Sequence, residues 1–216
     1  MSDPIQLVMP RGAGGFHGAC AGAPPQTVVL GWERHRWWPV LHNLGRAHAA
    51  LRAAQPVLLV RGKQRRPYRH ALFPTDFSAR SLEALTLARR ALPPMCFTLL
   101  HACRVCGEGY LQAAGVGEDV VEACRRRAEA AARAAGWRFA AQAPPGDTRL
   151  AVLVLRQPWA SAVAAFAGQS SPDLLVLDGA PATWWQGPLR RRQLRTLLAR
   201  TACDVLLLPA ARGARP

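Results

Sequence analysis

From residue 66 onward, the chain alternates between two patterns of hydrophobic and polar positions. Short apolar runs predict buried strands, and segments with apolar positions three and four residues apart predict amphipathic helices. The expected strands are residues 68–75, 96–102, 150–155, 172–179 and 203–210. The expected helices are residues 78–92, 118–136, 160–168 and 187–202. Continuously apolar strands separated by helices indicate a doubly wound α/β domain with a five-stranded parallel sheet.

Local signals set the ends of two helices. Ser78 is a plausible N-cap for the first helix, and Pro93 and Pro94 stop it. Gly136 is expected to end the Ala-rich helix that starts at residue 118, because glycine is common just after a helix. The apolar stripe expected to face the core in the first helix comprises Leu82, Ala84, Leu85, Leu87, Ala88 and Leu92. Three glycines predict a loop before the second helix: Gly107, Gly109 and Gly115.

The segment before residue 66 repeats the end of this domain. Residues 27–31, 39–54 and 55–62 parallel the last strand, helix and strand, and both copies carry a Trp-Trp pair in the loop. The organisation we expect is an irregular segment (1–26), a strand-helix-strand half-copy (27–62), a linker (63–67) and a complete domain (68–211). Leu41, Leu44 and Leu51 are expected to be buried under the half-copy's helix.

Composition limits the class of protein. Half of the 216 residues are hydrophobic, which suffices for a sizeable core, and no apolar run approaches the roughly 18 to 20 residues that span a bilayer. The first residues do not resemble a signal peptide, so we expect a cytoplasmic protein. The net charge is +15, and Lys63 is the only lysine among 28 basic residues. Codon drift in a GC-rich genome also produces such an arginine bias. A nucleic-acid or anionic-surface partner therefore stays an alternative.

One cluster of cysteine and histidine residues could carry metal or redox chemistry. The six cysteines are scattered, which favours reduced thiols. His101, Cys103 and Cys106 form the motif HACRVC. A structural zinc site usually needs a fourth ligand, and the chain has no second close pair of such residues; nothing in the sequence indicates that Cys124 or His70 supplies one. We expect ordinary loop and core roles and no bound metal. No nucleophile-elbow or Walker motif appears, which favours a non-enzymatic protein.

Several of these segments together resemble the universal stress protein (UspA-like) family. The stretch HALFPTDFSARSLEALTLARRAL is similar to that family's first strand, turn and helix, and FTLLHACRV to its second strand. PDLLVLDG, a helix and CDVLLLPA are similar to its closing section. The resemblance covers about residues 66–210 and implies a Rossmann-like fold of the adenine nucleotide alpha hydrolase type.

The resemblance also implies where a nucleotide would bind. In the ATP-binding branch, the Asp of the turn contacts the base, and a loop of the form Gly-x-x-Gly-x9-Gly-Ser/Thr holds the phosphates. This chain keeps the first glycine, Gly179, but has Ala182, Arg192 and Gln193 at the other positions, and Asp178 precedes the loop. The candidate nucleotide-binding residues are Pro74, Thr75, Asp76, Gly179, Arg191 and Arg192.

Each candidate also has a plain structural interpretation. Asp76 can be a helix-capping acid, and the arginines at 190–195 can be either an anion clamp or a solvated face. We therefore expect a non-enzymatic stress-response or regulatory binding module with a degenerate nucleotide site and no cofactor. The alternatives are an ATP-binding universal stress protein and a nucleic-acid or anionic-surface binder. The last strand, residues 203–209, should pair with a second copy or with residues 55–61.

Overall fold

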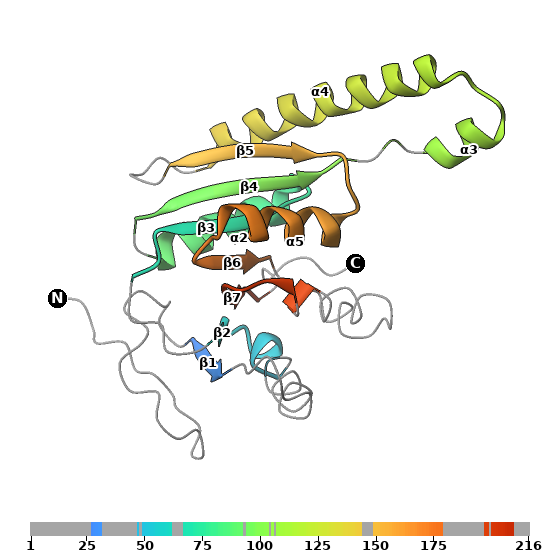
Figure 1. The fold of residues 1–216 in the computed structure, drawn as a ribbon. Coiled ribbons are helices and arrows are strands. Elements are labelled where there is room, and N and C mark those ends of the chain that lie inside the picture. The colour runs from blue at the N-terminus through green and yellow to red at the C-terminus, as the bar shows by residue number, and fades with distance from the viewer. Residues whose placement is uncertain are drawn as a thin grey trace.

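The computed structural model describes residues 27–31, 47, 49–61, 67–92, 94–103, 105, 107–143, 149–178, 197–198 and 200–209. Seven strands of these residues form one sheet in the order β1-β2-β7-β6-β3-β4-β5 (Figure 1). In the described part of the chain, no helix has the length and hydrophobicity needed to cross a membrane.

The predicted doubly wound domain is present and forms the larger part of the sheet. Its strands are β3 (His70–Pro74), β4 (Cys96–Ala102), β5 (Leu150–Leu155), β6 (Leu174–Leu177) and β7 (Asp204–Leu207). Every neighbouring pair among them is parallel. The order of the strands reverses between β3 and β6, and open α/β sheets bind ligands at the carboxyl ends of strands at such a switch point.

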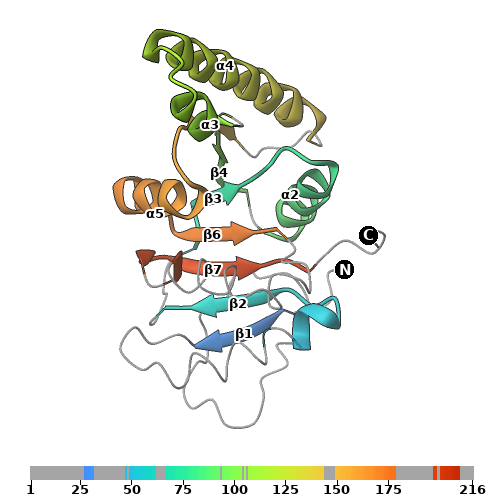
Figure 2. The same ribbon diagram turned by 90° about the vertical axis from the view of Figure 1, so that its right-hand side faces the viewer.

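Two further strands, from residues before β3, extend this sheet beyond β7. Strands β1 (Val28–Gly31) and β2 (Val57–Val60) are parallel to each other, and β2 is antiparallel to β7 (Figure 2). Leu58 lies opposite Leu206 in this register. The predicted pairing of residues 55–61 with residues 203–209 is therefore confirmed, and β2 covers the outer edge of β7.

Helices cover both faces of the sheet. The helices with described bounds are α2 (Ala79–Ala91), α3 (Glu108–Ala113), α4 (Glu118–Gln142) and α5 (Trp159–Ser170). Figure 2 shows α2 and α5 on opposite sides of the sheet. Successive strand residues point to opposite faces, so Leu72 packs with α5 and Phe73 with α2. Leu51 of the half-copy is buried on the α5 side, as predicted, whereas Leu41 and Leu44 lie outside the described residues.

Helix α2 follows its sequence signals closely. Ser78 is its N-cap, and the Ser78 Oγ accepts a hydrogen bond from the Ser81 N–H at 3.2 Å. The apolar stripe is buried or half-buried except at Leu87, which is 40% exposed. The expectation that Leu87 faces the core was therefore wrong. It lies at the edge of the buried face, where i+3 spacing alone does not decide between core and solvent.

Two expectations about residues 107–136 were also wrong. Helix α4 does not end at Gly136 but continues to Gln142. A Cβ at Gly136 would lie 2.5 Å from Val152 Cγ1 and 2.8 Å from Phe77 Cζ, so this glycine permits close contact with β5 and the turn after β3. The expected glycine-rich loop contains the short helix α3, with Gly107 and Gly115 on either side in the left-handed conformation.

Candidate functional site

The turn that follows β3 lies at the switch point of the sheet. Thr75 is buried, its N–H donates to the Leu100 carbonyl at 2.9 Å, and its Oγ1 accepts from the Phe77 N–H at 3.0 Å. Phe77 has a φ of 61°, a left-handed conformation that is costly for a bulky residue. Its ring stacks on His101 with centroids 4.6 Å apart and lies 5.5 Å from Phe139. These contacts hold the strained turn in place.

Asp76 lies in this turn and contacts the start of α2. Its Oδ1 accepts hydrogen bonds from the Ser78 N–H and the Ser81 hydroxyl, both at 2.9 Å. Burial alone raises the pKa of Asp76, but the hydrogen bonds from Ser78 and Ser81 outweigh it and lower the pKa. The predicted capping role of Asp76 is thus visible in its contacts, and Asp76 is in its charged form at neutral pH.

A second carboxyl group joins this cluster from the end of β6. The Ser81 Oγ lies 2.5 Å from Asp178 Oδ2, and Ser81 itself is fully buried. Burial raises the pKa of Asp178, and the nearby charge of Asp76 raises it further. A hydroxyl carries one hydrogen and donates to one carboxylate at a time. Both contacts are satisfied together when a protonated Asp178 donates to Ser81 and Ser81 donates to Asp76.

Arg80 supplies positive charge beside the two acids. It occupies the first turn of α2, and its charge lowers the pKa of Asp178, against the larger effect of burial. Its Nε and Nη2 atoms are buried and have no hydrogen-bond partner among the described residues. Two carboxyl groups, the hydroxyl of Ser81 between them and two guanidinium donors therefore lie close together at the switch point.

The structure brings together only some of the residues predicted for a nucleotide site. Pro74, Thr75 and Asp76 lie at the switch point, with Asp178 beside them. Gly179, Arg191, Arg192 and Cys106 lie outside the described residues. Sequence reasoning missed Ser81 and Arg80. Their place in the first turn of a helix after the turn acid was the available signal, because side chains there point back toward the strand end.

The histidine and cysteine candidates have other roles in this structure. The His101 Nδ1 donates to the Thr75 carbonyl at 2.9 Å, so this ring supports the turn. His70, the possible further ligand, pairs with Thr98 at the opposite end of the sheet. Burial and the charge of Glu129 raise the pKa of the Cys103 thiol, which disfavours the reactive thiolate. In the described ranges, no three His, Cys, Asp or Glu side chains gather as a metal site would require.

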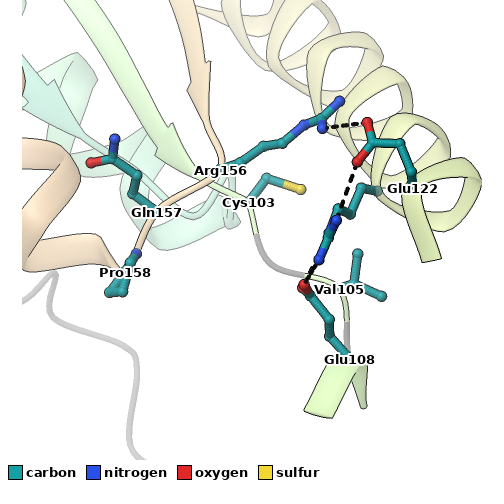
Figure 3. Close-up of a pocket in the computed structure, with 8 residues that line it drawn as sticks. Cys103, Val105, Glu108, Glu122, Arg156, Gln157 and Pro158 are labelled. Carbon is teal, nitrogen blue, oxygen red and sulfur yellow. Dashed lines mark hydrogen bonds and ion pairs between the residues drawn. The ribbon is translucent and has the colours of Figure 1, made fainter. Parts of the chain in front are cut away.

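A pocket of about 420 Å³ lies at the carboxyl ends of β4 and β5 and is bordered by residues of α3 and α4 (Figure 3). Arg125 contacts Glu108 at 2.6 Å, and Arg156 contacts Glu122 at 2.8 Å. The two arginines that line the pocket are thus already paired with carboxylates. The pocket residues are Cys103, Val105, Glu108, Glu122, Arg125, Arg156, Gln157 and Pro158. Sequence analysis did not predict this pocket, because its residues are spread over 56 positions and only their tertiary arrangement unites them.

Comparisons with known proteins were made for sequence and for structure. No protein-family model matches the chain, and no curated protein sequence matches it significantly. Solved structures do match. A universal stress protein from Archaeoglobus fulgidus DSM 4304 has a TM-score of 0.53 and 12% identity, over 87% of this chain and 62% of that chain.

Two further solved structures are similar. A Pseudomonas aeruginosa UCBPP-PA14 protein assigned as a universal stress protein has a TM-score of 0.51 and 17% identity, over 86% of this chain and 64% of that one. A universal stress protein in complex with cAMP has a TM-score of 0.39 and 18% identity, over 68% and 100% of the two chains. That TM-score is too low to support a statement about ligands of this chain. At the level of fold, the chain is therefore similar to the universal stress proteins, as its sequence predicted.

Proposed function

We propose that this chain is a universal stress family protein that acts as a non-enzymatic stress-response or regulatory binding module with a degenerate nucleotide site. The observation that carries the proposal is the contact of Ser81 with both Asp76 and Asp178. In the ATP-binding branch of the family that the sequence resembles, the Asp of the turn contacts the base. Here Asp76 Oδ1 is committed to the protein's own donors.

Electrostatics at the switch point supports the same proposal. Asp178 precedes the segment where phosphates would bind, and Asp76 keeps a negative charge a few ångströms away through Ser81. A polyphosphate would meet carboxyl groups there instead of the backbone N–H groups that glycines expose. The sequence also lacks residues that a phosphate loop requires. The positions expected to hold two glycines and a Ser or Thr are occupied by Ala182, Arg192 and Gln193.

One observation favours the alternative of ATP or another anion. The Nε and Nη2 donors of Arg80 are buried and without a partner among the described residues, and guanidinium groups bind phosphate well. Under this alternative, a phosphate group would accept from Arg80 and would compete with Asp178 for the same space.

The half-copy supports a regulatory module that is complete in one chain. We infer that residues 27–62 substitute for the partner subunit that would otherwise pair with β7. The support is the antiparallel β2–β7 register and the burial of Leu58 and Leu206, each 1% exposed. The alignment to the Archaeoglobus protein also covers 87% of this chain, more than residues 68–211 alone provide.

Calorimetric titration with ATP tests the nucleotide proposal. We expect dissociation constants well above the micromolar range that corresponds to about −8 kcal/mol. The chain purified without added nucleotide should also release none by mass spectrometry. Low-micromolar ATP binding that both Asp76→Ala and Arg80→Gln abolish would establish the alternative. Glu83→Gln, an exposed change on the same helix, is the control for a general loss of charge.

A further inference from the structure

The outward face of helix α4 carries a row of arginines beside an exposed tryptophan, and all of them but Arg133 have no ion pair among the described residues. Helix α4 is the outermost element beyond β5 (Figures 1 and 2). Only Val121, Gly136 and Phe139 of its 25 residues are buried. Trp137 is 62% exposed, although burial of this side chain would be strongly favourable. A long helix with so little buried surface has a face available for another molecule.

Charges on α4 are segregated between its two sides. Glu122 and Glu129 pair with Arg156 of the β5–α5 connection, Glu122 and Glu118 also contact Arg125, and Glu129 contacts Arg133. These glutamates are thus neutralised. Arg126, Arg127 and Arg138 are exposed and have no ion pair among the described residues. Asp119, in the first turn, is the one exposed acid of α4 not in such a pair. From Arg126 to its end, over about five turns, α4 therefore presents positive charge outward.

Helical geometry places these side chains along one track. At 3.6 residues per turn, Arg126, Arg133 and Trp137 fall on one side of the exposed face, and Arg127 and Arg138 fall on the other. Between them lies a stripe of exposed small side chains: Ala123, Ala130, Ala134 and Ala141. From Arg126 to Arg138 the track is about 18 Å long, at roughly 1.5 Å per helical residue, so it can contact several successive nucleotides.

We propose that this surface, defined as Arg126, Arg127, Arg133, Trp137 and Arg138, binds single-stranded nucleic acid. Arginines on both sides of a low alanine stripe would contact the phosphates of a strand lying along α4. Trp137 would stack on an unpaired base, since indole rings bind bases without regard to sequence. This role is additional to the proposed regulatory function and does not depend on the nucleotide site.

Other occupants fit this surface less well. A second copy of α4 would bring like charges together, which is unfavourable. A membrane-surface helix buries a broad face of large apolar side chains, whereas here alanines surround one tryptophan. A duplex would satisfy the arginines but would leave Trp137 without an unpaired base.

Fluorescence anisotropy with a labelled oligothymidylate of about 20 nucleotides tests the proposal on the full chain. We expect binding at about 50 mM salt that weakens steeply by about 200 mM. The slope of log K against log salt is negative. In R126A/R127A/R138A its magnitude should decrease by about 2, at roughly 0.7 per lost phosphate contact. Trp137→Ala should weaken binding roughly 5- to 150-fold, the range for loss of one stacked base.

Matched controls make the outcome decisive. R52A/R69A/R90A removes three exposed arginines from other elements and should leave binding nearly unchanged. Equal loss in both triple variants would contradict the α4 surface and indicate non-specific attraction. Absence of binding at low salt, duplex binding as tight as single-strand binding, or binding only to anionic vesicles would each overturn the proposal. Circular dichroism of each variant verifies that the fold is retained.

Discussion

The hydroxyl of Tyr68 donates a 2.8 Å hydrogen bond to Oδ2 of Asp204, a carboxyl group that is 2% exposed. The other oxygen of Asp204 accepts from the Arg61 N–H at 2.6 Å. Arg61 follows β2, Tyr68 precedes β3, and Asp204 begins β7. One buried carboxyl group therefore connects the end of β2, the start of β3 and the start of β7.

Removing this hydroxyl should loosen the connection. Burial raises the pKa of Asp204, against the two hydrogen bonds and the nearby Arg61 charge that lower it. Tyr68→Phe takes one donor from this buried acid, which should cost about 1 to 3 kcal/mol of unfolding free energy. Thermal unfolding should show a decrease of roughly 2 to 4 °C per kcal/mol. Tyr110→Phe, at a side chain 78% exposed, should have almost no effect, and equal effects would contradict the role of Tyr68.

Deletion of residues 1–62 should expose the outer edge of β7. This edge is hydrophobic and would have unpaired backbone donors and acceptors, so the remaining chain should dimerise or aggregate. Light scattering coupled to size-exclusion chromatography measures the change. Deletion of residues 1–26 alone leaves β2 on β7 and should preserve the oligomeric state of the full chain. If the chain that lacks residues 1–62 keeps the thermal stability and the oligomeric state of the full chain, the half-copy does not substitute for a partner.

Stability should depend on pH through Asp178. The pKa of Asp178 in the folded chain is raised above the ordinary value of 3.8. Its contribution to the free energy of unfolding is therefore fully present below pH 3.8 and is lost as pH rises through the folded pKa. Asp178→Asn imitates the protonated form and should stabilise the protein by roughly 1 kcal/mol at pH 7. The gain should shrink below pH 4. Melting temperatures between about pH 3.5 and 8 test this. A gain that is independent of pH would refute the titration, and Glu83→Gln should leave the profile unchanged.

Gly136 should not tolerate even a methyl group. Gly136→Ala places a Cβ 2.5 Å from Val152 Cγ1 and 2.8 Å from Phe77 Cζ, which should cost about 1 to 3 kcal/mol despite the better helix propensity of alanine. Gly168 is the control, because it is exposed on α5 and a Cβ there would have no atom within 4 Å. Gly168→Ala should therefore raise the free energy of unfolding by roughly 0.5 to 1 kcal/mol, through helix propensity without a steric cost. Urea unfolding of both variants measures the two effects. Similar stabilisation in both would show that α4 moves freely away from the sheet.

Local sequence patterns predicted the strands, most of the helices and the pairing of β2 with β7. Strand β6 is continuously apolar and fully buried, and such runs alternating with helical segments are typical of a parallel sheet that is covered on both faces. The apolar last strand needed a cover, and a similar strand in the same chain supplied it. These are properties of local pattern and repetition, which a single chain records directly.

Tertiary structure alone decided the candidate sites. Ser81 meets Asp178 across 97 positions, and Gly136 lies inside a helix because Phe77 and Val152 approach it. Glu122 and Glu129 turn toward Arg156, which leaves Arg126, Arg127 and Arg138 unopposed on the outside of α4. Such contacts depend on which segments the sheet order brings together. Their free energies come from distances and burial that no local pattern specifies.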